Sequence, residues 1–172
     1  MKVNYILPYL IILLTFPSNF SVAQKIDTES LYESLEWNFV GPYRGGRSTT
    51  AAGLDSKPYT FFMGTTGGGV WKTNDAGNTW NNVSDGQITA GSIGAIAISP
   101  SDENIIYVGT GSADPRGNIS SGNGMYKSTD FGENWEFIGL PKAGLIGKIS
   151  IHPKNSDIVY VAALGDIFGK NP

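Results

Sequence analysis

Two aspartates, Asp75 and Asp130, occur in the same short sequence frame and could carry out chemistry. Residues 73–80 read TNDAGNTW and residues 128–135 read STDFGENW. In both copies a hydroxyl residue stands two places before the aspartate, a glycine two places after it, and a tryptophan three places after the glycine. A carboxylate held in a fixed frame could serve as a nucleophile, general acid or general base in hydrolysis. The alternative is that both aspartates stabilise the fold.

The frame belongs to a longer internal repeat. GSIGAIAISPSDENIIYVGTG at 91–111 aligns without gaps with GLIGKISIHPKNSDIVYVAAL at 144–164, and with a weaker copy at 46–66. Short alternating or apolar segments in each copy are separated by Gly, Pro and Ser, which is typical of short strands joined by turns. Four sequential strands at a period of about 45–55 residues indicate a propeller blade. The sequence therefore predicts an all-β fold, a β-propeller of four-stranded antiparallel blades.

The predicted blades account for most of the chain. Blade one covers residues 46–85, with strands at 46–53, 59–65, 69–73 and 79–83. Blade two covers residues 91–140, with strands at 93–98, 105–108, 124–128 and 135–138. The start of blade three covers residues 144–172, with strands at 146–152 and 158–163. Because propellers close with about 4–8 blades, we expect this partial β-propeller (37–172) to be the N-terminal part of a larger protein that supplies the remaining blades.

The N-terminus has the pattern of an export signal. Tyr5–Phe16 is an apolar run, and Ser21-Val22-Ala23 has the small-x-small pattern of a signal peptidase site. The run is shorter than the roughly 20 apolar residues that span a bilayer. We expect a signal peptide at 1–23, a secreted or periplasmic protein, and no membrane span after signal removal. Residues 24–36 form a lead segment, and 37–41 are expected to add a strand to the last blade.

Composition excludes several functions. A net charge of −3 gives no basic surface for nucleic acid. The absence of cysteine excludes disulfides and Cys-ligated zinc. No metal-ligand cluster, phosphate-binding glycine loop or Ser-His-Asp set is recognisable, so no cofactor and no metal are expected. The single histidine, His152, aligns with Ser99 and Leu54 in the other copies, which indicates a turn residue.

The repeated frame is expected to be structural. It lies between the third and fourth strands of a blade, in a hairpin turn, and occurs once per blade, whereas a catalytic residue is needed once. The aspartate and the hydroxyl can accept hydrogen bonds from turn amides, the glycine permits positive φ, and the tryptophan can pack over the turn. The residues with this expected role are Thr73, Asp75, Gly77, Trp80, Ser128, Asp130, Gly132 and Trp135.

The frame resembles the Asp-box, or BNR repeat, of bacterial sialidases, xyloglucanase-type glycoside hydrolases and sortilin-type sorting receptors. The chain is most similar to secreted bacterial sortilin-like proteins, which often carry the label glycosyl hydrolase. Four stretches within residues 37–169 carry this likeness: GPYRGGRSTTAAG, GGGVWKTNDAGNTW, IGAIAISPSDENIIYVGTG and VYVAALGDIFG. The resemblance implies the propeller fold. It leaves the function open, because the repeat occurs in enzymes and in receptors.

Strand alternation places the candidate ligand-binding residues on the face opposite the repeated turns. Arg44 and Arg47 could bind a carboxylate or phosphate in bidentate fashion, or could satisfy backbone carbonyls where the first strand begins. Tyr43-Arg44 matches half of the Phe/Tyr-Arg-Ile-Pro motif with which sialidases hold a substrate carboxylate. Gly45-Gly46 departs from that motif, so sialidase activity is not implied.

The loop at 112–123 (SADPRGNISSGN) is present in blade two and not in blade one. Long loops on a rigid scaffold often carry function. Asp114, Arg116 and Asn118 could contact a sugar or a peptide, or an Asp114–Arg116 ion pair could simply order the loop. Glycoside hydrolysis requires two carboxylates about 5–9.5 Å apart. The candidates for that pair are Asp114 and Asp166.

Two functions fit these residues. The favoured one is a secreted, sortilin-like propeller that binds a protein, a peptide or a glycan as a scaffold. The alternative is a glycoside hydrolase, xyloglucanase-like or sialidase-like, in which this chain builds part of the polysaccharide groove. Under either function, the 172-residue chain by itself is expected to be inactive.

Overall fold

A computed structural model describes residues 47–114 and 117–165, together with Tyr32, Leu35 and Gly169. The chain divides into two compact units, residues 1–42 and 43–172. In the first unit, the Leu35 amide donates a hydrogen bond to the Tyr32 carbonyl. The predicted signal peptide and the strand expected at 37–41 lie outside the described residues.

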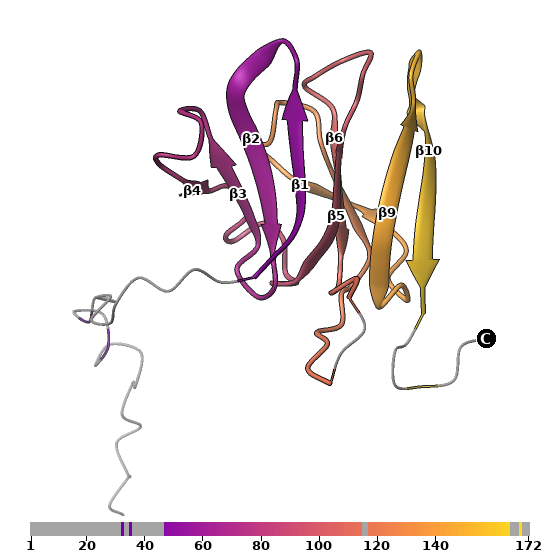
Figure 1. Cartoon of the computed structure of the whole chain (residues 1–172). Coiled ribbons are helices and arrows are strands. Elements are labelled where there is room, and N and C mark those ends of the chain that lie inside the picture. Colours follow the sequence, from indigo (N-terminus) through magenta and orange to yellow (C-terminus); the bar gives the residue numbers. More distant parts are fainter. Residues whose placement is uncertain (1–31, 33–34, 36–46, 115–116, 166–168, 170–172) are drawn as a thin grey trace, which may run out of the picture. The chain divides into compact units, whose positions relative to one another are not determined.

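The second unit contains two four-stranded antiparallel sheets and one two-stranded sheet, each in sequential strand order (Figure 1). The first sheet consists of β1 (Ser48–Leu54), β2 (Lys57–Thr65), β3 (Val70–Thr73) and β4 (Asn81–Asn82). The second consists of β5 (Ile93–Ile98), β6 (Ile106–Thr110), β7 (Met125–Ser128) and β8 (Glu136–Gly139). The third pairs β9 (Leu145–His152) with β10 (Asn155–Leu164). The predicted all-β fold with four-stranded antiparallel blades is confirmed.

The outer strand of the first sheet is shorter than the predicted span 79–83. β4 contains only Asn81 and Asn82, which pair with Lys72 and Trp71. Trp80 precedes this strand, and its indole donates a hydrogen bond to the Gly77 carbonyl of the turn. Trp135 likewise precedes β8.

The central strands are apolar because both of their faces are covered. All five residues of β6 are buried, and so are the first four of β5. One hydrophobic cluster joins the first two sheets through Phe62, Val70, Ile93 and other residues. A second cluster joins the second and third sheets through residues such as Tyr107 and Ile146. Short strands buried on both faces read as continuous apolar runs, which is the pattern that the repeat shows.

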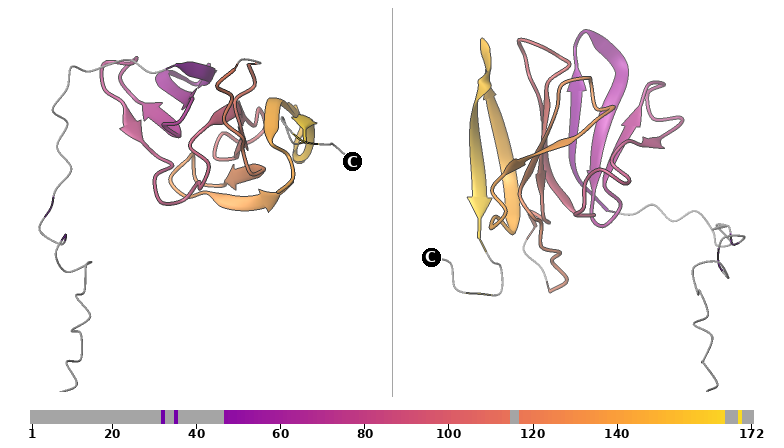
Figure 2. Two further views of the ribbon diagram at one scale, coloured as in Figure 1. Left: turned by 90° about the horizontal axis from the view of Figure 1, so that it is seen from below. Right: turned by 180° about the vertical axis from the view of Figure 1, so that it is seen from behind.

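The three sheets lie side by side through their first strands. β5 contacts β1 on one side and β9 on the other, as the views in Figure 2 show. The turns after β1, β5 and β9 lie at the upper end in Figure 1, and the loop after β6 extends from the lower end. The turns that join the first and second strands of each sheet therefore lie at the end opposite the long loop. None of the described segments forms a helix long and apolar enough to cross a membrane.

Candidate functional site

Asp75 is held entirely by its own turn. Its Oδ1 accepts hydrogen bonds from the Thr73 hydroxyl and the Thr79 amide, each at 2.8 Å, and its Oδ2 accepts from the Thr79 hydroxyl at 2.6 Å. The Thr73 hydroxyl also accepts from the Gly77 amide at 2.9 Å. The hydrogen bonds from Thr79, followed by that from Thr73, lower the pKa of Asp75 to about 2. The carboxylate is therefore ionised and fully engaged near neutral pH, so it is not available as a general acid.

Asp130 repeats this arrangement in the second sheet. Its Oδ1 accepts from the Ser128 hydroxyl at 2.8 Å and from the Asn134 amide at 2.9 Å, and its Oδ2 accepts from Asn134 Nδ2 at 2.6 Å. The hydrogen bonds from the Asn134 side chain and amide lower the pKa of Asp130 to about 2. The donor to Oδ2 differs between the copies, since it is the Thr79 hydroxyl in one and the Asn134 side-chain amide in the other. Asp130 Oδ1 also accepts from the Glu133 amide at 3.1 Å.

The backbone of both turns uses two consecutive residues with positive φ. Gly77 and Gly132 have φ of 91° and 85°, as their place in the frame predicts. The residues before them, Ala76 and Phe131, also have positive φ, at 59° and 60°. The left-handed region disfavours side chains, so these two positions depend on the hydrogen bonds around them. The sequence frame did not predict this second residue, because Ala and Phe give no conformational signal.

The candidate ligand-binding residues are only partly within the described structure. Arg47 is exposed, and its carbonyl accepts a hydrogen bond from the Thr66 amide at 3.0 Å. Asp114 and Asn118 are exposed on the loop after β6. Arg44, Arg116 and Asp166 lie outside the described residues.

The loop at 112–123 is fixed at its base. The Ser112 amide donates to the Ser120 carbonyl at 3.0 Å, and the Gly122 amide donates to the Gly144 carbonyl at 2.7 Å. The Thr110 hydroxyl accepts from the Asn123 amide at 2.8 Å. These bonds tie the loop to β6 and to the start of the third sheet. It therefore presents Asp114 and Asn118 from a rigid base, which is the arrangement expected of a binding loop.

His152, predicted to be a turn residue, is the last residue of β9 and directly precedes the turn to β10. Its Nδ1 accepts a hydrogen bond from the Lys154 amide at 3.2 Å. Among the described residues, no three His, Cys, Asp or Glu side chains are grouped so that they could hold a metal ion.

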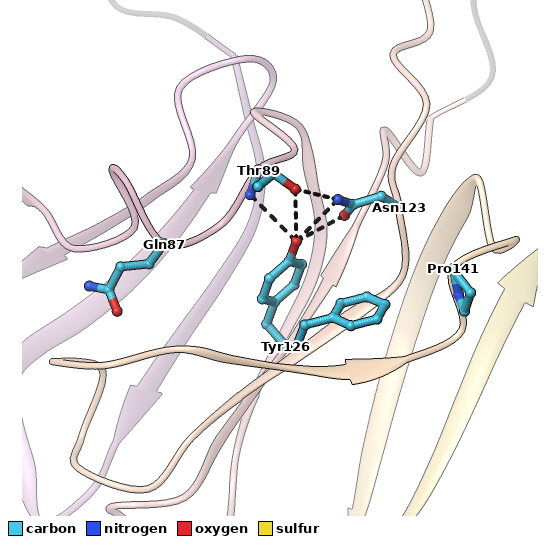
Figure 3. A pocket seen from close by; sticks show the side chains of 6 residues that line it. Gln87, Thr89, Asn123, Tyr126 and Pro141 are labelled. Atoms are coloured by element: carbon cyan, nitrogen blue, oxygen red, sulfur yellow. Dashed lines mark hydrogen bonds between the residues drawn. The ribbon is translucent and has the colours of Figure 1, made fainter.

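One feature was missed from the sequence. An open pocket of about 410 Å³ lies beside the base of the long loop (Figure 3). It is lined by Gln87, Thr89, Asn123, Tyr126, Phe137 and Pro141. These residues come from three stretches of the chain, 87–89, 123–126 and 137–141, so spacing along the chain could not reveal that they meet. One signal for this pocket was present in the sequence: Tyr126 is aromatic, as is Trp71 at the equivalent position of the first blade.

Comparison with known proteins gives both a relative in sequence and a likeness in structure. No family model matches the chain. Over 85 residues, 48% of this chain, it is 35% identical to a protein of Neosartorya fischeri described as a probable oligoxyloglucan-reducing end-specific xyloglucanase. The matched stretch is 9% of that protein.

Among solved structures, the chain is similar to an ancestral GH74 enzyme and to the GH74 xyloglucanase from Xanthomonas campestris. The first has a TM-score of 0.58 at 20% sequence identity, covering 74% of this chain and 15% of that one. The second has a TM-score of 0.52 at 20% identity, covering 73% of this chain and 20% of that one. At this identity the likeness shows the fold alone. The predicted fold is thus confirmed: two four-stranded sheets and a partial third one match a portion of GH74 propeller structures.

Proposed function

We propose that this chain is part of the substrate-binding propeller of a secreted glycoside hydrolase that acts on xyloglucan or a closely related neutral polysaccharide. The observation that carries the proposal is the 35% identity over 85 residues to the protein described as a xyloglucanase. This reverses the order of the two functions weighed from the sequence. The sortilin-like scaffold was favoured there, and the comparisons support the hydrolase better.

The loop face supports a polysaccharide ligand. It presents Asp114 and Asn118 on an anchored loop, and polysaccharides are bound by such carboxylate and amide groups through their hydroxyls. Arg47 is a further exposed donor near the start of β1. In this proposal Asn118 and Arg47 orient the polysaccharide. Asp114 is the candidate acid or base, and the second carboxylate that hydrolysis needs comes from elsewhere in the whole protein.

The chain spans 9% of the curated relative and 15–20% of the two solved structures, so the test uses the protein expressed from its complete gene. The purified protein is incubated with xyloglucan, with a neutral mannan and with sialyllactose, and new reducing ends are measured. We expect cleavage of xyloglucan and none of sialyllactose. Loss of general acid or base catalysis in Asp114→Asn should lower kcat by at least about 100-fold with unchanged circular dichroism.

The matched control is Asp55→Asn, an exposed aspartate in the turn between β1 and β2 at the opposite end of the sheets. It should keep wild-type kcat. Failure to cleave any neutral polysaccharide, combined with tight binding of a peptide, would favour the scaffold function and overturn the proposal.

A further inference from the structure

The pocket in Figure 3 lies between the second sheet and the connection that precedes it, and every residue that lines it is described. Gln87 and Thr89 come from the connection between the sheets, and Asn123 comes from the base of the long loop. Tyr126 lies on β7 and Phe137 on β8. It is therefore distinct from the exposed part of the loop where Asp114 and Asn118 stand.

The floor of this pocket is aromatic. The rings of Tyr126 and Phe137 meet edge to face, with centroids 5.4 Å apart. Tyr126 is buried at 4% exposure, but Phe137 is 46% exposed. The blade does not require an aromatic residue at this place, because Phe137 aligns with Asn82 of the first blade. An exposed ring beside a pocket can pack against the C–H groups of a sugar ring, since both surfaces are apolar.

The rim of the pocket is polar and adaptable. Asn123 Nδ2 donates to the Thr89 hydroxyl at 2.5 Å and to the Tyr126 hydroxyl at 3.1 Å. The Tyr126 hydroxyl lies 3.0 Å from the Thr89 hydroxyl and 3.3 Å from Asn123 Oδ1. Either hydroxyl can be the donor between Thr89 and Tyr126. The two hydroxyls can therefore exchange an internal hydrogen bond for one to a ligand hydroxyl, which can both donate and accept.

Gln87 supplies a fixed donor at the other side. Its Oε1 accepts from the Trp135 amide at 2.8 Å, and its Nε2 donates to the Glu133 carbonyl at 3.1 Å. The side-chain amide is held in place by these two bonds, and the second hydrogen on Nε2 is left for a ligand.

None of the six lining residues carries a charge. A sialic acid, a phosphate or a peptide terminus would find no counter-charge among them, whereas a neutral sugar requires none. The volume of about 410 Å³ falls within the range of small-ligand pockets, about 300–1,000 Å³. We propose that this pocket is a secondary binding site for one neutral sugar ring, a terminal or branching residue of the polysaccharide. The choice of a saccharide over other uncharged ligands rests on the proposed function.

The test separates polymer binding from catalysis. Affinity electrophoresis of the complete protein in gels that contain xyloglucan gives the apparent Kd for the polymer, and hydrolysis of a xyloglucan heptasaccharide gives kcat. Phe137→Ala should raise the apparent Kd by about three- to tenfold, the range of one aromatic contact, and should leave kcat unchanged. Thr89→Val removes a rim hydroxyl at nearly constant volume. It should also raise the apparent Kd and leave kcat unchanged. The matched control is Tyr59→Ala, a 66% exposed aromatic residue on β2 outside the pocket, which should change neither quantity.

The outcomes distinguish the two proposals. Cleavage of xyloglucan with unchanged polymer affinity in both pocket variants would overturn the pocket and leave the proposed function standing. Without cleavage of xyloglucan, the same variants are tested on an array of neutral glycans. Binding by the wild type that is lost in Phe137→Ala would support the pocket and reject xyloglucan as the substrate. Binding of no neutral glycan would overturn the pocket.

Discussion

Ile93, on the first strand of the second sheet, packs directly against the backbone of Gly64 in the first sheet. A Cβ added at Gly64 would lie 2.7 Å from Cγ2 of Ile93. Gly109 and Ile146 repeat this contact between the second and third sheets, where the added Cβ would lie 2.2 Å from Cγ2. Both isoleucines are fully buried. Adjacent sheets thus pack through a glycine on the second strand of one and an isoleucine on the first strand of the next.

Gly109→Ala should therefore destabilise the protein. The added methyl group overlaps a fully buried side chain, and overpacking of this kind costs about 1–3 kcal/mol. The free energy of unfolding in urea measures the effect. Gly117→Ala is the control, since a Cβ there would meet nothing within 4 Å. Equal stability of the two variants would mean that Ile146 does not occupy the contact described.

Stability should also fall at acid pH because of Asp75 and Asp130. Both carboxyls have a folded-state pKa of about 2, below their ordinary value of 3.8. A depressed pKa stabilises the folded state above the unfolded value, and this stabilisation is lost as the pH falls from about 4 towards 2. Urea midpoints measured from about pH 6 down to about pH 2 should show this loss.

The double variant Asp75→Asn with Asp130→Asn provides the comparison. It should be less stable than the wild type near neutral pH and should lose less stability through the acid range. Asp85→Asn, at an exposed aspartate outside both turns, should keep the wild-type profile. A double variant with the wild-type acid transition would show that the two carboxylates do not cause it.

Local spacing predicted the elements of the fold well, because each strand and turn is encoded by its own residues. The alternation at Ile93–Ile98 and the turn residues around Asp75 and Asp130 are examples. Contacts between sheets were not predictable in the same way. Spacing shows that Trp135 belongs to a turn, but not that its indole reaches Val83 of the preceding blade. The site was harder to predict than the fold. The loop sequence predicts where Asp114 lies, but it does not show which ligand Asp114 contacts.

The two tryptophans of the repeated frame should differ in their contribution to stability. Trp135 is 8% exposed and donates from Nε1 to the Val83 carbonyl at 2.8 Å, across the boundary between sheets. Trp80 donates to the Gly77 carbonyl within its own turn at 3.1 Å and is less buried. Trp135→Phe leaves a carbonyl without its donor at a buried contact and should cost about 1–3 kcal/mol. Trp80→Phe should cost less in the same urea experiment, and the reverse order would contradict the assignment of Trp135 to the sheet boundary.

Lys72 should contribute strongly to holding the first two sheets together. Its side chain is only 9% exposed. Its Nζ donates at 3.0 Å both to the Phe131 carbonyl and to Glu133 Oε1, and lies 4.5 Å from the centroid of the Phe131 ring. Lys127 occupies the same repeat position in the second sheet but is 22% exposed and meets Asp157 at 3.4 Å. Lys72→Ala removes the interactions of Lys72 at a nearly buried position and should cost about 1–3 kcal/mol. Lys127→Ala should cost less than about 1 kcal/mol.

A third variant separates the ion pair of Lys72 from its other contacts. Glu133 is 67% exposed, so its carboxylate is screened by solvent and contributes little on its own. Glu133→Gln keeps the Lys72 bond to the Phe131 carbonyl and the contact with the ring, and should cost less than about 1 kcal/mol in urea unfolding. If Glu133→Gln destabilised the protein as much as Lys72→Ala, the ion pair would account for the whole effect. The backbone and aromatic contacts of Lys72 would then contribute nothing to the packing of the two sheets.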